Sequence, residues 1–311
     1  MGTLSIWNFI VKTLSTRIFV DFMILIFKAE IKPFKKKIRW LVMSMYLAYK
    51  YPSNSLHKSI PASSLNSPLW RGMNQIFRFN LKYINLQGLI MSPVVVAVTS
   101  PNMFDYLSDF KHESNSNIRK SAEIYSEIFE VDQDKFRNAL VYYLKIIDEL
   151  FQSANFDYFD RSRILQIGPG LAILDFFMYL EGATLYSVET PEMNYFQEMI
   201  QSRINELDSS IQFRFQNISN IQKPFGVISF FAFTEMDMPT RDNLLSVMRR
   251  ADWIIIVSNR YFEGISNFDY LEKVFDEDFN LTKTFTLDQI EIEEMMNYAK
   301  KHRAFLFTKK N

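Results

Sequence analysis

Residues 163–192 carry the pattern that most restricts how this chain can fold. A short apolar run, 164–167, ends at the Gly-Pro-Gly turn 168–170. A helical pattern follows, and a second apolar run, 183–188, ends at Glu189. This order predicts a β-strand, a glycine turn, a helix and a second strand that ends in an acidic residue. Such a unit is typical of α/β proteins with a parallel sheet.

The residue types of this unit suit a nucleoside ligand. Glycine at 168 and 170 lets the backbone turn sharply and leaves room for an adenosine-bearing ligand, while the following helix offers free N–H groups at its start. Glu189 follows Gly168 by 21 residues, close to the roughly 20 typical of such units, and its carboxylate can accept both hydroxyls of a ribose. A purely structural strand-to-helix turn is the alternative.

Helical and β-like segments alternate on both sides of this unit. Helical spacing is present within 118–148, 190–207, 241–250 and 289–301, and β-like runs are present at 211–216, 225–233, 253–258, 281–287 and 304–308. The run 225–233 is continuously apolar, as expected of a parallel strand that is buried on both faces. The sequence therefore predicts helices packed on a mostly parallel sheet.

Two motifs resemble a known family. The glycine turn lacks the third glycine of a dinucleotide site, and G-P-G with Ala172 two positions on resembles motif I of the class I S-adenosylmethionine (SAM)-dependent methyltransferases. Residues 227–236, VISFFAFTEM, resemble the fourth-strand segment of the sugar O-methyltransferases found in bacterial surface-polysaccharide gene clusters. Ala232 and Glu235 match that segment, whereas Phe230 replaces an asparagine.

The resemblance is strongest over residues 160–270. It implies a Rossmann-like class I methyltransferase sheet with its last strand antiparallel, preceded by a helical N-terminal region, and it implies SAM as the cofactor. Gln166 stands where the family commonly has an acidic residue. The expected cofactor-binding residues are Gln166, Gly168, Gly170, Glu189, Asn217 and Phe231. The implied reaction is O-methylation of a sugar or glycan hydroxyl in surface-polysaccharide biosynthesis.

Three polar residues at predicted strand ends are candidates for the chemistry. Glu235 and Asp237 follow the fourth predicted strand and Asn259 follows the fifth, at the edge where open α/β sheets bind ligands. Glu235 is the first candidate for the general base that takes the proton of a hydroxyl nucleophile, and Asp237 is the second. All three carry oxygen ligands suited to Mg²⁺, the second candidate cofactor. Helix capping is the structural alternative for Glu235 and Asp237.

Composition and patterning divide the 311-residue chain into three predicted regions. These are a basic, apolar helical arm with a linker at 1–65, a mainly helical cap at 66–155 and a Rossmann-like SAM-binding domain at 156–311. Residues 1–60 hold ten basic and two acidic residues, although the whole chain has a net charge of zero. The cofactor half is therefore acidic, which disfavours nucleic acid as a partner.

The absence of cysteine excludes thiolate catalysis and disulfides. Segment 4–27 is apolar but interrupted by charges, so it falls short of the roughly 18 residues of a spanning helix. No secretory signal is evident, so we expect a cytoplasmic protein, with peripheral membrane contact through residues 1–50 as an alternative.

No pattern indicates an oligomeric state. Two other functions stay open: methylation of another small molecule, and a non-catalytic, membrane-associated binding protein that keeps the fold.

Overall fold

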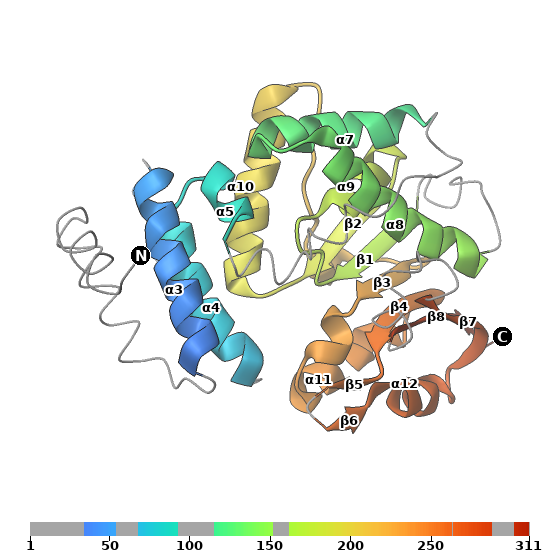
Figure 1. Cartoon of the computed structure of the whole chain (residues 1–311). Coiled ribbons are helices and arrows are strands. Elements are labelled where there is room, and N and C mark those ends of the chain that lie inside the picture. The colour runs from blue at the N-terminus through green and yellow to red at the C-terminus, as the bar shows by residue number, and fades with distance from the viewer. Residues whose placement is uncertain are drawn as a thin grey trace.

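The computed structural model describes residues 34–53, 68–92, 115–151, 162–262, 264–287 and 302–310. Its described helices are α3 (Phe34–Lys50), α4 (Pro68–Tyr83), α5 (Leu86–Ile90), α7 (Ser116–Phe129), α8 (Gln133–Phe151), α9 (Ile173–Leu180), α10 (Pro191–Leu207), α11 (Met238–Met248) and α12 (Asn267–Phe275), with short 3-10 helices η3 (Ile218–Asn220) and η4 (Ala232–Glu235) (Figure 1). The described strands are β1 (Arg163–Ile167), β2 (Thr184–Val188), β3 (Gly226–Phe230), β4 (Trp253–Asn259), β5 (Tyr261–Phe262), β6 (Ile265–Ser266), β7 (Phe279–Thr286) and β8 (His302–Lys309).

Six of these strands form one sheet in the order β2-β1-β3-β4-β8-β7. Strands β2, β1, β3 and β4 run parallel to their neighbours, whereas β8 is antiparallel to both β4 and β7. The helices α9 and α11 lie between successive parallel strands in the chain, as crossover connections require. The predicted Rossmann-like sheet, mostly parallel with its last strand antiparallel, is confirmed.

Helices cover both faces of the sheet. One hydrophobic cluster joins α7, α8, α9 and α10 to side chains such as Ile164 of β1 and Ile255 of β4. The other joins α11 and α12 to Leu165 and Ile167 of β1. Because successive strand side chains point to opposite faces, Gln166 lies on the same face as Ile164, beneath the α7–α10 layer.

The N-terminal helices pack against the side of this layer (Figure 1). The ring of Phe77 on α4 meets that of Phe196 on α10 edge-on, at 5.6 Å between centroids. Arg78, one residue on, forms an ion pair with Glu192, whose side chain is fully buried. These contacts fix α4 to the helix that follows β2. The domain boundaries at 65/66 and 155/156 stay predictions, since residues 54–67 and 152–161 lie outside the described residues.

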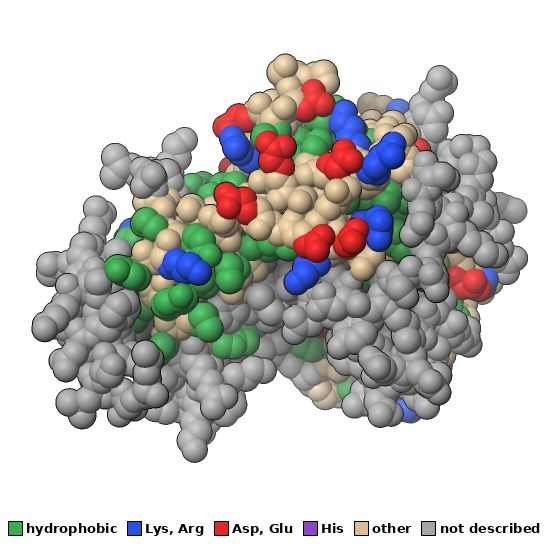
Figure 2. All heavy atoms as spheres, turned by 45° about the horizontal axis from the view of Figure 1, so that its top comes forward, with side chains coloured by type: hydrophobic (Ala, Val, Ile, Leu, Met, Phe, Trp, Pro, Cys, Tyr) green, Lys and Arg blue, Asp and Glu red, His purple; other side chains and the backbone are tan. Residues whose placement is uncertain are grey.

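Helix α3 exposes several large apolar side chains. Met43, Tyr46 and Tyr49 are each about half exposed, and Figure 2 shows hydrophobic side chains at the surface of the N-terminal helices. Most of the basic arm, residues 1–33, lies outside the described residues, and its membrane role stays a prediction. In the part of the chain that the structure describes, no helix combines the length and hydrophobicity needed to cross a bilayer.

The predicted strand at 211–216 is wrong. Only Gln216 makes a bridge, with Tyr186 of β2, and its N–H donates to the Leu185 carbonyl at 2.7 Å. The segment is held instead by its side chains, because the ring of Phe213 packs on α9, 5.3 Å from that of Phe176. Alternating apolar residues predicted the extended conformation, but a strand also needs a ladder partner, which a local pattern does not reveal.

The predicted strand at 225–233 is too long. Strand β3 ends at Phe230, Phe231 has a positive φ of 66°, and the chain turns into η4. The other predicted strands and helices match β4, β7, β8, α10 and α11 with shifted ends, and the predicted helical segment 118–148 overlaps α7 and α8, which extend beyond it at both ends. Helix α12 and the β5–β6 hairpin were not predicted. The predicted helix at 289–301 lies outside the described residues.

Candidate functional site

The glycine turn at the end of β1 is built from left-handed residues. Gly168, Gly170 and Ala172 have φ angles of 69°, 58° and 57°. The N–H of Gly168 donates to the carbonyl of Val188 at 2.9 Å, which joins the turn to the end of β2. Glycine is favoured at the first two positions because a Cβ destabilises this conformation by about 1–2 kcal/mol.

The two glycines serve different purposes. A Cβ at Gly168 would lie only 2.0 Å from the Cβ of Ala232, so glycine is needed there to let η4 pack against the turn. A Cβ at Gly170 would meet no described atom within 4 Å. Within the described part of the chain, the open approach that we expected for a ligand is therefore found at Gly170, whereas the space beside Gly168 is filled by Ala232.

Glu189 lies against this turn, as predicted. Its Oε2 would be 3.8 Å from a Cβ built on Gly168, and its Oε1 accepts the N–H of Thr190 at 2.8 Å. Burial raises the pKa of Glu189 to about 7, although the N–H groups of Thr190 and Gly170 stabilise the charged form and Glu192 adds a small rise. The structure thus brings together Gly168, Gly170 and Glu189.

Polar side chains on β1 and α9, the two elements that flank the turn, are buried, and sequence reasoning missed Asp175. Gln166 is 3% exposed and Asp175 of α9 is fully buried. Neither the Gln166 Oε1 nor either carboxyl oxygen of Asp175 has a hydrogen-bond partner among the described residues. The tyrosines Tyr125 and Tyr143 lie within electrostatic range of Asp175, and burial followed by the charge of Asp175 raises the pKa of both.

Burial holds the pKa of Asp175 well above its ordinary value. The contact with its own backbone N–H opposes this, and the Glu189 carboxyl adds to it. In the apolar run ILDFFMYL, the single charged residue was the available sequence signal. An acid in the first turn of a helix is usually explained by the helix dipole, so the residue type alone does not predict that Asp175 is buried.

We expect Asp175→Asn to raise the free energy of unfolding by about 1–3 kcal/mol at pH 7.5. The folded-state pKa is raised, so the unfolded chain ionises first as pH rises above about 4, and stability falls with pH in the wild type. The gain from the substitution should therefore shrink toward zero near pH 4. Urea unfolding at pH 7.5 and at pH 4 measures this gain in stability, with Asp242→Asn, at an exposed position of α11, as the control. An equal effect at both pH values contradicts the prediction.

A second group of candidate residues lies at the carboxyl ends of β3 and β4. Phe231 is half-buried, and its ring meets that of His302 edge-on at 5.0 Å. Glu235 ends η4, and its Oε1 accepts the side-chain N–H of Asn259 at 3.4 Å. Burial raises the pKa of Glu235 to about 7, which makes its carboxylate more basic than an exposed one. Ala232 connects this group to the glycine turn.

Two predicted site residues act as helix caps. Asp237 accepts the N–H of Thr240 at 3.0 Å at the start of α11, and exposed Asn217 accepts the N–H of Ser219 at 2.9 Å at the start of η3. The adenine contact of Asn217 and the catalytic role of Asp237 stay predictions. Within the described ranges, no group of three or more acidic or histidine side chains could hold a metal ion, so the magnesium site of Glu235, Asp237 and Asn259 also stays a prediction.

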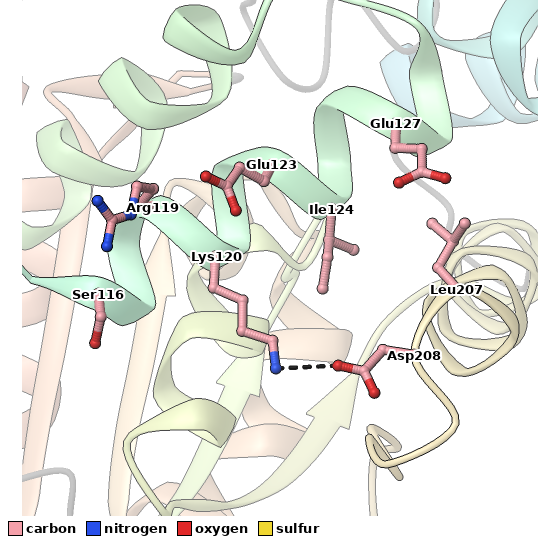
Figure 3. Close-up of a pocket in the computed structure, with 8 residues that line it drawn as sticks. All are labelled: Ser116, Arg119, Lys120, Glu123, Ile124, Glu127, Leu207 and Asp208. Atoms are coloured by element: carbon pink, nitrogen blue, oxygen red, sulfur yellow. Dashed lines mark ion pairs between the residues drawn. The ribbon is translucent and has the colours of Figure 1, made fainter.

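A surface groove lies elsewhere, between α7 and the end of α10 (Figure 3). Lys120 and Asp208 form an ion pair across it at 3.1 Å. Its lining residues are Ser116, Arg119, Lys120, Glu123, Ile124, Glu127, Leu207 and Asp208. Figure 2 shows acidic and basic side chains interspersed on the molecule's upper face. None of the lining residues belongs to the glycine turn or to the β3–β4 edge.

No model of a protein family and no curated protein matches the sequence. Solved structures are similar at low identity. Magnesium protoporphyrin IX methyltransferase from Synechocystis PCC 6803, solved with bound SAM, has 14% identity over 65% of this chain and 98% of its own, with a TM-score of 0.38. A SAM-dependent methyltransferase from Aquifex aeolicus has 13% identity over 52% and 87%, with a TM-score of 0.35. The 16S rRNA methylase ArmA has 9% identity over 62% and 98%, with a TM-score of 0.37. Similarity at this level does not assign a substrate.

Proposed function

We propose that this protein is a SAM-dependent methyltransferase that transfers a methyl group to a sugar hydroxyl. One observation carries the proposal: the Glu189 carboxylate at the end of β2 faces the Gly168 turn at the end of the neighbouring parallel strand β1. Ligands of open α/β sheets bind at this carboxyl edge. A carboxylate and a glycine turn in this relation suit a ribose and the adjoining part of an adenosine.

The residues present fit this cofactor. Glu189 would accept the ribose hydroxyls, and the open side of Gly170 would admit the ligand. Gln166, whose buried Oε1 has no partner among the described residues, would accept a hydrogen bond from the amino-acid part of the cofactor. When bound, SAM supplies an electrophilic methyl group. The protein's own task is to align the acceptor oxygen and to remove its proton.

Glu235 is the candidate for removing that proton. It lies at the carboxyl end of β3, next to the strand that carries the glycine turn, and Ala232 of the same short helix contacts that turn. A base is most effective when its pKa lies near the working pH, and the pKa of about 7 satisfies this condition. Phe231 supplies a half-buried aromatic ring at the same edge, a suitable surface for one face of a sugar.

The sugar substrate rests on the resemblance of residues 227–236 to sugar O-methyltransferases. A role in surface-polysaccharide biosynthesis follows from the same resemblance. Transfer of labelled methyl groups from SAM to a panel of nucleotide-sugars, free glycans and phenols tests the acceptor class. If phenols but not sugars are labelled, the proposed acceptor changes from a sugar to another small molecule. The exclusion of nucleic acid stays a prediction, and a ribosomal RNA acceptor in the panel tests it.

Replacement of Glu189 tests the cofactor site. We expect Glu189→Gln to weaken binding of S-adenosylhomocysteine about 10–100-fold, because hydrogen bonds to a charged acceptor contribute about 1.5–3 kcal/mol. Wild-type affinity should fall as pH drops below about 7, where this carboxyl gains a proton, and the variant should lack that dependence. Calorimetry between pH 5.5 and 8.5 measures both effects, with Glu198→Gln, at an exposed position of α10, as the control. Absence of binding by the folded wild type would reject the proposed function.

A further inference from the structure

Arg241 of α11 is fully buried although it carries a permanent charge. Its Nε donates to the carbonyl of Met236 at 2.9 Å, and its Nη2 donates to the carbonyl of Thr234. These two carbonyls flank Glu235 in the chain. The guanidinium therefore holds the backbone on both sides of the candidate base, and it also lies over the ring of Tyr270, 5.1 Å from the centroid.

The third contact of Arg241 starts a chain of side-chain hydrogen bonds that returns to Glu235. The Nη1 of Arg241 donates to Oδ1 of Asn267 at 3.0 Å. The Nδ2 of Asn267 donates to Oδ1 of Asn259 at 2.8 Å, and also to the Asn259 carbonyl at 3.2 Å. The Nδ2 of Asn259 donates to Oε1 of Glu235 at 3.4 Å.

Arg241 determines which atoms donate and which accept along this series of hydrogen bonds. An arginine side chain can only donate, so the atom of Asn267 that faces it must be the carbonyl oxygen. The amide nitrogen of Asn267 then faces Asn259 and requires an oxygen there. The remaining amide nitrogen of Asn259 is thereby turned toward Glu235. A carboxylate is the only form of Glu235 that accepts at every oxygen lone pair, so the chain favours the ionised side chain.

We propose that Arg241 and Asn267 are positioning residues for Glu235, which fix its backbone and present the Asn259 N–H to its carboxylate. This inference deepens the proposed function, since it rests on Glu235 as the base. Neither residue touches the reacting atoms. Fully buried Asn267 begins α12, so the chain links the α11–α12 layer to the carboxyl edge of β3 and β4.

Other charged or titratable side chains lie on the segments around Glu235. They are Asp237 at the start of α11, Arg260 after β4, Asp269 on α12 and His302 on β8, opposite Asn259 in the strand register. Asp269 is hydrogen-bonded to Ser266. A rate profile reports every ionisable group at the site, so it would not by itself assign a titration to Glu235. A direct measurement on the Glu235 carboxyl is needed.

The test is a double-mutant cycle on the pKa of Glu235, measured by carbon NMR of the side-chain carboxyl in the ligand-free protein. Glu235→Gln assigns the resonance by removing it. We expect Asn259→Leu to raise this pKa by roughly half a pH unit or more, since a donor to the charged form is lost. Asn267→Leu should raise it in the same direction, and the double variant should add nothing to Asn259→Leu.

Ser266→Ala is the matched control, because Ser266 precedes Asn267 at the start of α12 but is outside the chain of donors. It should leave the Glu235 pKa unchanged. If Asn267→Leu does not fold, Asn267→Ser replaces it, since a neutral side chain of that length does not reach Asn259. A folded Asn267 variant with the wild-type Glu235 pKa, or additive shifts in the cycle, would overturn the proposal.

Failure of this inference is separable from failure of the proposed function. The NMR cycle needs no ligand, whereas the proposed function is tested by binding of S-adenosylhomocysteine to the wild type. Binding without the expected shifts rejects only the positioning role. If the pKa of Glu235 shifts as expected but the protein does not bind the cofactor, the hydrogen-bond chain is supported. Its role in catalysis is then rejected, and so is the inference as stated.

Discussion

Gly168→Ala should destabilise the protein by about 2–5 kcal/mol and weaken binding of S-adenosylhomocysteine more than tenfold. Two effects add. The left-handed conformation, with φ of 69°, disfavours a Cβ, and the added methyl group would lie 2.0 Å from the Cβ of Ala232. Relief of that overlap must move either the turn or η4, and these segments carry the two halves of the candidate site. Urea unfolding and calorimetric titration measure the two losses.

Two further variants separate the effects at Gly168. Gly264→Ala has the same kind of backbone strain, with φ of 84°, but its methyl group would meet no described atom within 4 Å. It should therefore lose only about 1–2 kcal/mol of stability and no affinity. Adding Ala232→Gly to Gly168→Ala should recover part of the loss, because the overlapping methyl is gone. A double variant no better than Gly168→Ala would show that η4 does not pack on the turn as described.

The parts of the fold that were predictable are those with a strong local pattern. The glycine turn between two apolar runs identified β1, α9 and β2, and the continuous apolar runs identified β3 and β4 because strands buried on both faces contain little else. The segment 211–216 was mispredicted for the opposite reason. Its alternating residues suit a strand, but its side chains pack on α9 and only Gln216 bonds to β2.

The candidate site was also predictable only where a local sequence pattern joins its residues. Gly168 and Glu189 were predictable together because their spacing in the chain fixes their relation in space. The contact of Ala232 with Gly168 and the pairing of Arg241 with Asn267 connect residues 64 and 26 positions apart. No sequence pattern joins such pairs, so only the folded chain reveals them. The sequence allowed Asp237 to be either a candidate general base or a helix cap, and the structure shows the cap.

Glu235→Gln should lower the methyl-transfer rate constant about 100–10,000-fold and leave the affinity for S-adenosylhomocysteine unchanged. Glutamine keeps the size of the side chain and an oxygen that can accept the Asn259 N–H, so the fold and the cofactor half of the site should persist. What it lacks is the ability to take a proton. Single-turnover assays with labelled SAM and the acceptor identified in the substrate panel measure the rate.

The same role of Glu235 predicts how the methyl-transfer rate changes with pH. The base must be ionised to act, and burial raises the pKa of Glu235 to about 7. The wild-type rate should therefore rise about tenfold per pH unit below pH 7 and level off above pH 7. The residual rate of the variant should not show this rise. Glu206→Gln, at an exposed position of α10, is the control. A rate lost to a chelator and restored by Mg²⁺ would instead assign Glu235 to the predicted metal site, and a variant with more than a tenth of the wild-type rate would remove Glu235 from the chemistry altogether.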